Sequence, residues 1–100
     1  MADITELSSR VGTIARQLGH NRDPKVILLF LVEELGEVIR AFMKESGHKE
    51  DNARITETYR EELGDVFFLL LSLAAVKDID LEGQLERTIE KLKTRSLSDI

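Results

Sequence analysis

The chain has no cysteine and no tryptophan, and its formal net charge is −5. Without cysteine it can form neither disulfide bonds nor thiolate zinc sites. An acidic balance argues against a surface that binds nucleic acid. The longest apolar runs fall well short of the roughly 20 residues that cross a bilayer, and the first residues lack the pattern of a signal peptide. We therefore expect a cytoplasmic protein that binds neither nucleic acid nor membrane.

Helical periodicity is what the sequence does contain. Apolar residues recur at helical spacing from residue 4 to 18, and a second helix should begin at Asp23-Pro24 and run to about Glu45. A third helix is predicted from about residue 53 to 76, and a fourth after Asp80. No segment alternates as a strand would. The 100 residues therefore predict one all-α domain, an antiparallel bundle of about four helices.

The segment Val66–Val76 is apolar nearly all the way round. A helix of that kind must be covered on several sides, and the other helices of so short a chain can hardly do this alone. We therefore expect oligomerisation to complete the bundle, in a homodimer or homotetramer. A monomer with a closely packed core is the alternative.

Two acidic segments of the helical pattern are nearly identical, namely Glu33-Glu34-Leu35-Gly36-Glu37-Val38 and Glu61-Glu62-Leu63-Gly64-Asp65-Val66. Residues at i and i+3 share a helix face, so each segment presents two carboxylates on one side. Glu34 and Glu62 lie in the arcs that should be buried, and neither helix has a Lys or Arg in the same arc. An uncompensated buried carboxylate costs several kcal/mol. A cation between the two helices is therefore expected.

The type of ligand indicates which cation. A site made only of carboxylate oxygens favours Mg²⁺, with Mn²⁺ also compatible. His20 and His48 both fall in predicted turns, where we interpret them as solvated. Glycine inside a helix costs about 1 kcal/mol relative to alanine, so Gly36 and Gly64, at matching places, predict a close approach of the helices.

A surface interpretation competes for part of this pattern. Glu33 and Glu37 project on the same side as Arg40 and Lys44, with which they could form a solvated stripe of weak ion pairs. This alternative does not extend to Glu34, which has no basic residue in its arc.

Two motifs on consecutive helices resemble the signature of the MazG-like all-α nucleoside triphosphate pyrophosphohydrolases. They are Glu34-Leu35-Gly36-Glu37 and Glu62-Leu63-Gly64-Asp65. The resemblance runs from about residue 23 to 95 and implies one MazG-like domain over residues 1–100. It implies Mg²⁺-dependent cleavage of a (deoxy)nucleoside triphosphate between its α and β phosphorus atoms, which releases the monophosphate and pyrophosphate. The residues implied to hold Mg²⁺ are Glu34, Glu37, Glu62 and Asp65. Glu33 is implied to orient or deprotonate the attacking water.

Substrate contacts are harder to assign from the same resemblance. Lys91, Lys93 and Arg95 near the end of the last helix could reach the triphosphate, from a neighbouring subunit, or could simply complement the helix dipole. We take Lys91 and Arg95 as the candidates. Several relatives stack the base on tryptophan, which this chain lacks. Three aromatic residues could replace it, or could instead belong to the core, and these are Phe30, Tyr59 and Phe68.

Two other functions remain open at this point. Phosphoribosyl-ATP pyrophosphatase is a relative of similar size, but its second motif usually reads differently from the segment 62–68. A non-catalytic helical dimer that binds a structural or regulatory ion is the alternative from another class.

Overall fold

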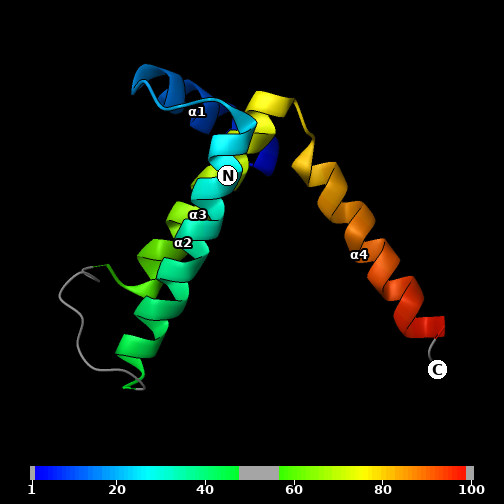
Figure 1. The fold of residues 1–100 in the computed structure, drawn as a ribbon. Coiled ribbons are helices and arrows are strands. Elements are labelled where there is room, and N and C mark those ends of the chain that lie inside the picture. The colour runs from blue at the N-terminus through cyan, green and yellow to red at the C-terminus, as the bar shows by residue number, and fades with distance from the viewer. Residues whose placement is uncertain (1, 48–56, 99–100) are drawn as a thin grey trace.

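The computed structural model describes residues 2–47 and 57–98. They form four helices, which are α1 (Ile4–Gln17), α2 (Pro24–Glu45), α3 (Tyr59–Lys77) and α4 (Leu81–Ser98) (Figure 1). The described residues contain no strand, so the prediction of an all-α fold is confirmed. None of the helices in these ranges combines the length and apolar character that a membrane crossing needs.

Capping side chains set where the helices begin. Asp23 accepts a hydrogen bond from the backbone N–H of Lys25, and Pro24 occupies the first turn of α2, as predicted. At α3, the Thr58 hydroxyl accepts from the Glu61 N–H at 3.2 Å while the Glu61 carboxylate accepts from the Thr58 N–H at 3.1 Å. This reciprocal pair starts α3 at Tyr59. The predicted start near residue 53 is therefore wrong, and the segment 53–56 lies outside the described residues.

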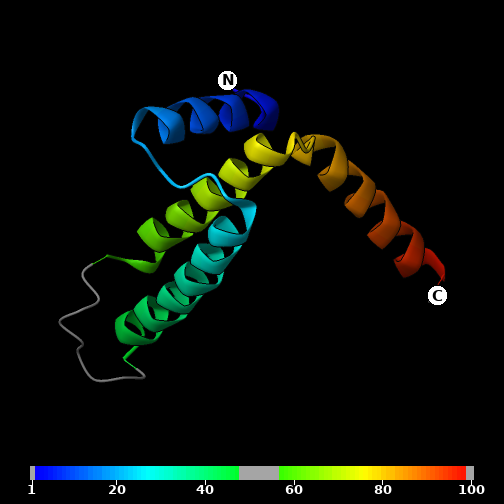
Figure 2. The same cartoon turned by 45° about the horizontal axis from the view of Figure 1, so that its top comes forward.

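Helices α2 and α3 lie side by side, and the chain direction reverses between them (Figures 1 and 2). Helix α1 lies across the C-terminal half of α3, where the Ser8 hydroxyl donates to the carbonyl of Leu71 at 3.2 Å. A Cβ added to Gly12 of α1 would come within 3.0 Å of the Ala75 Cβ. Glycine at this position is therefore what lets α1 and α3 approach so closely.

The close approach predicted at Gly36 and Gly64 does not occur within the chain. A Cβ added at Gly64 would meet nothing within 4 Å, and one at Gly36 would meet only the guanidinium of Arg40 on the same helix. The prediction was wrong because the cost of a helical glycine does not reveal which helix, if any, lies opposite.

The apolar core of the described residues is small. Its buried members are Ala15, Ile27, Ala41, Leu71 and Ala74. Helix α4 contacts α1 near its own start, where the backbone N–H of Ile4 donates to Glu82 at 3.3 Å, and then leads away from the other helices (Figures 1 and 2). A single chain therefore leaves its fourth helix unpacked along most of its length. The antiparallel bundle stays a prediction for an assembly of chains.

Large apolar side chains are correspondingly exposed on the helices, most of all on α2 and α4. On α2 they include Leu29, Val32 and Ile39, which are 63–70% exposed, and on α4 they include Leu85 and Leu92, which are 49% and 54% exposed. Exposed apolar side chains of this kind are typical of a surface that packs against another molecule. The exposure is consistent with the predicted oligomer.

Candidate metal centre

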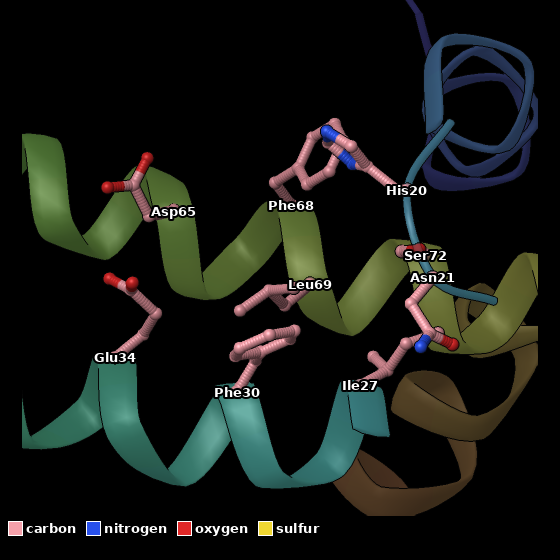
Figure 3. A pocket seen from close by; sticks show the side chains of 9 residues that line it. All are labelled: His20, Asn21, Ile27, Phe30, Glu34, Asp65, Phe68, Leu69 and Ser72. Atoms are coloured by element: carbon pink, nitrogen blue, oxygen red, sulfur yellow. The ribbon is translucent and has the colours of Figure 1, made fainter. Parts of the chain in front are cut away.

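Three of the predicted ligands meet between α2 and α3. Glu34 comes from the middle of α2, while Glu62 and Asp65 come from the first two turns of α3. Each offers one carboxylate oxygen, and these three oxygens all lie within 4.8 Å of one another. Figure 3 shows the carboxylates of Glu34 and Asp65 facing each other across the gap between the helices. We call these three side chains the acidic cluster.

Two members of the acidic cluster are withdrawn from water, as the helical wheels predicted. Glu62 is only 7% exposed, and Glu34 is half-buried with a buried Oε2 atom that has no hydrogen-bond partner. The ion pairs found among the described residues, Glu37–Arg40 and Glu90–Lys93, leave all three acids out. A buried carboxylate oxygen without a partner is costly, and a bound cation is a partner that would satisfy it.

The acidic cluster shifts the titration of its most buried member. The pKa of Glu62 is raised from 4.5 to about 7, first by burial and then by a hydrogen bond with the adjacent Glu34 carboxyl and by the charge of that carboxyl. The charges of Glu57 and Asp65 act in the same direction.

Glu57 is an additional carboxylate that the sequence pattern did not reveal. A hydrogen bond with Asp65 and the charge of that residue raise the pKa of Glu57, which is exposed. Glu57 precedes the N-cap of α3, in a segment without helical periodicity, so no spacing rule pointed to it.

The other two acidic candidates occupy the outer side of α2. Glu37 forms an ion pair with Arg40, one turn further along the helix, and lies outside the acidic cluster. This is the pairing that the surface interpretation anticipated. Glu33 is exposed to solvent. The roles of Glu37 as a ligand and of Glu33 as a base stay predictions.

The basic candidates lie on the unpacked helix. Lys91 and Arg95 are exposed on the part of α4 that leads away from α2 and α3 (Figure 1), and Lys93 is 3.4 Å from its partner Glu90. Within one chain nothing brings these side chains to the acidic cluster. Their role in substrate binding stays a prediction that requires a neighbouring subunit.

A pocket of about 300 Å³ opens directly beside the acidic cluster (Figure 3). Glu34 and Asp65 form one end of it, and the remaining lining residues are His20, Asn21, Ile27, Phe30, Phe68, Leu69 and Ser72. The ring of His20 meets that of Phe68 edge to face, with centroids 5.9 Å apart. His20 is exposed, as predicted, and it also contacts Phe68. Phe30 is 48% exposed and lines the pocket, so it is not a core residue, whereas Tyr59 packs against Phe42.

Comparison with known protein families gives a match over most of the chain. The family model described as the MazG nucleotide pyrophosphohydrolase domain matches residues 22–98, a range that contains both acidic segments and helices α2, α3 and α4. The chain belongs to the MazG family. The resemblance based on the two acidic segments is thereby confirmed. The family's activity is nucleotide pyrophosphohydrolysis.

A relative in Bacillus subtilis (strain 168) supports the same assignment. The chain is 38% identical over 73 residues to "Uncharacterized protein YpjD", an alignment that covers 72% of this chain and 66% of YpjD. The chain thus spans just under two thirds of that relative's length. No solved structure matches the chain. Helix α1 and the linker residues 18–21 precede the MazG match, so what they contribute to the site follows from the structure alone.

Proposed function

We propose that this MazG domain hydrolyses a (deoxy)nucleoside triphosphate to its monophosphate and pyrophosphate, and that it does so with Mg²⁺. The observation that carries the proposal is the unpartnered, buried Oε2 of Glu34 in a cluster with Glu62 and Asp65. Such an arrangement destabilises the metal-free protein, and it is explained if the cluster binds a cation. The oxygen-only ligand set fits Mg²⁺, and Mn²⁺ would fit as well.

Glu34, Glu62 and Asp65 would hold the ion between α2 and α3. Once bound, Mg²⁺ supplies charge that neutralises phosphate oxygens and lowers the pKa of water. The chain's own part is to place the buried Glu62 and the half-buried Glu34 on two helices, so that the geometry of the ligands is set before substrate arrives. Asp65, which is exposed, leaves one side of the cluster accessible to the phosphates.

Glu33 and Glu37 complete the proposed mechanism from the outer side of α2. Glu33 is accessible to water and would accept the proton of the attacking water molecule. Glu37 would join the ligands only by giving up its partly exposed ion pair with Arg40, which would cost on the order of 1 kcal/mol. Lys91 and Arg95 would contact the triphosphate from a second subunit of a homodimer or homotetramer.

Product analysis tests the function. Purified protein with Mg²⁺ should release pyrophosphate from at least one of the common nucleoside triphosphates, and EDTA should stop the release. Glu62→Gln should lose this activity, whereas Glu6→Gln, which alters an exposed glutamate on α1, should retain it. Orthophosphate as the first product would mean attack at the terminal phosphorus. Cleavage of phosphoribosyl-ATP alone would assign the other pyrophosphatase, and no release from any nucleotide would favour a non-catalytic dimer.

A further inference from the structure

A hydrogen bond between residues 14 positions apart joins the end of α2 to the start of α3. The backbone N–H of Tyr59, the first residue of α3, donates to Oε2 of Glu45, the last residue of α2, at 2.7 Å. The end of α2 and the start of α3 lie at the same end of the helix pair (Figures 1 and 2). The first N–H groups of a helix have no partner inside that helix. Glu45 therefore supplies from α2 a partner that α3 cannot supply itself.

The charge of Glu45 is unfavourable for its own helix. The C-terminal end of a helix carries a partial negative charge, which favours Lys or Arg in the last turn and disfavours a carboxylate. The N-terminal end of α3 carries the opposite partial charge, so the same carboxylate is favourable where its oxygen lies. A hydrogen bond from a helix N–H to a carboxylate is also charge-assisted, which makes it one of the stronger kinds. The contact with α3 therefore explains why a glutamate ends α2.

An aromatic contact reinforces the same junction. Phe42 lies one turn before Glu45 on α2, so the two side chains share a helix face. The rings of Phe42 and Tyr59 meet edge to face, with centroids 5.6 Å apart and planes inclined at 82°. Aromatic pairs of this geometry attract each other beyond the effect of the area that they bury. Two side chains of α2 thus hold both the backbone and the ring of the first residue of α3.

Tyr59 begins the part of α3 that carries two members of the acidic cluster. Glu62 lies one turn after Tyr59, and Asp65 lies one turn further. The third member, Glu34, comes from α2, and the three oxygens lie within 4.8 Å of one another. That spacing requires the first turns of α3 to keep their position against α2. Because helix ends fray, a contact that fixes the first residue of α3 also steadies the carboxylates in the turns behind it.

We propose that Glu45 is a positioning residue of the metal centre, which holds Glu62 and Asp65 against Glu34 without touching the ion. This inference rests on the proposed function, and it adds a residue that lies outside both acidic segments. Glu34 lies three turns before Glu45, about 16 Å along the axis of α2. This distance exceeds the Debye length of about 8–10 Å. The charge of Glu45 is thus largely screened from Glu34, and the role of Glu45 depends on its hydrogen bond.

Binding of Mn²⁺ to the metal-free protein, measured by isothermal titration, tests this role without requiring turnover. Glu45→Ala should weaken binding about 3- to 10-fold, because the hydrogen bond is lost and fewer molecules have their ligands in place. Glu45→Gln keeps an acceptor oxygen at the same reach and should bind Mn²⁺ within about twofold of the wild type. Glu45→Asp keeps the charge but is one methylene shorter, so it should behave like Glu45→Ala. The alanine and glutamine variants lose the same charge, so the difference between them measures the bond.

Two further measurements separate positioning from stability. The amide proton of Tyr59 should resonate further downfield in the wild type and in Glu45→Gln than in Glu45→Ala, as expected for a hydrogen-bonded amide. In Glu45→Ala the Mg²⁺ concentration for half-maximal pyrophosphate release should rise by the same factor as the Kd for Mn²⁺, while kcat at saturating Mg²⁺ stays at the wild-type value. Glu6→Ala, which removes an exposed glutamate from α1, should change none of these quantities.

Three results would overturn the positioning role. The first is equal Mn²⁺ affinity in the wild type and Glu45→Ala, even if the variant melts at a lower temperature, because Glu45 would then only stabilise the fold. The second is equal weakening in Glu45→Gln and Glu45→Ala, and the third is wild-type affinity in Glu45→Asp, because either would mean that the charge matters and the bond does not. All three leave the proposed hydrolysis intact. A wild-type protein that neither binds Mn²⁺ nor releases pyrophosphate would overturn both proposals.

Discussion

Replacing Glu62 with glutamine should separate catalysis from stability. Glutamine has nearly the shape of glutamate but carries no charge, and Glu62 is 93% buried beside Glu34 and Asp65. We expect Glu62→Gln to abolish Mg²⁺-dependent hydrolysis, because it removes a ligand. In the metal-free protein we expect the same change to be stabilising near pH 8, because it removes repulsion between buried carboxylates.

The size of the effect follows from the pKa of Glu62. That pKa rises from 4.5 to about 7 on folding, so the folded protein binds the proton more tightly than the unfolded chain does. Stability must then fall as the pH increases from about 4.5 to about 7, and the loss is complete above that range. Without screening by water, the free energy of unfolding would fall by about 3 kcal/mol over this pH range. Water at the open side of the acidic cluster screens it to about 1–2 kcal/mol.

Thermal unfolding followed by circular dichroism can measure this difference. In EDTA at pH 8 the Glu62→Gln protein should melt about 5–10 °C above the wild type, and the gap should close toward pH 5. Adding Mg²⁺ should stabilise the wild type and not the variant. Glu6→Gln serves as the control and all samples need equal protein concentration, since oligomers melt in a concentration-dependent way. A variant that melts below the wild type in EDTA at pH 8, or a gap independent of pH, would refute the reasoning.

Three further predictions concern the surroundings of the acidic cluster. Glu33→Gln should lower turnover about 10²- to 10⁴-fold and leave the Mg²⁺ concentration for half-maximal activity unchanged; a change in that concentration would make Glu33 a ligand. Arg40→Met should release Glu37 from its ion pair and lower the Mg²⁺ concentration for half-maximal activity up to about fivefold. An increase in that concentration would show that Glu37 does not bind the ion. Phe67→Glu, at an exposed position on α3, should give monomeric or insoluble protein, and a wild-type monomer by sedimentation would contradict the expected oligomer.

Much of the fold was predictable because its signals are local. Asp23 and Pro24 mark the start of α2 by a hydrogen bond and a ring constraint that involve only neighbouring residues. Glu34 and Glu62 were recognisable because helical spacing places them among apolar residues without a basic partner. Such arguments need only the period of the helix, and the structure brings both residues into one cluster with Asp65.

The missed features depend on contacts that no local pattern encodes. The contact between Gly12 and Ala75 joins residues far apart in the chain, and a glycine in a helix carries no sign of the helix that will cross it. His20 and Glu57 lie outside the helices, where helical periodicity gives no information about position. The course of α4 was not predictable either, because the described helices of the same chain leave Leu85 49% exposed and place no packing surface along most of α4.

The contact at Gly12 has a consequence for the shape of the pocket beside the acidic cluster. The linker that carries His20 is hydrogen-bonded to the end of α1, so any shift of α1 relative to α3 moves one wall of the pocket. A methyl group at position 12 would lie 3.0 Å from the Ala75 Cβ, so α1 or α3 would have to move by a few tenths of an ångström. The shape of the pocket thus depends on a helix crossing whose residues do not line it. A substitution at this crossing can change the pocket while every acidic residue stays in place.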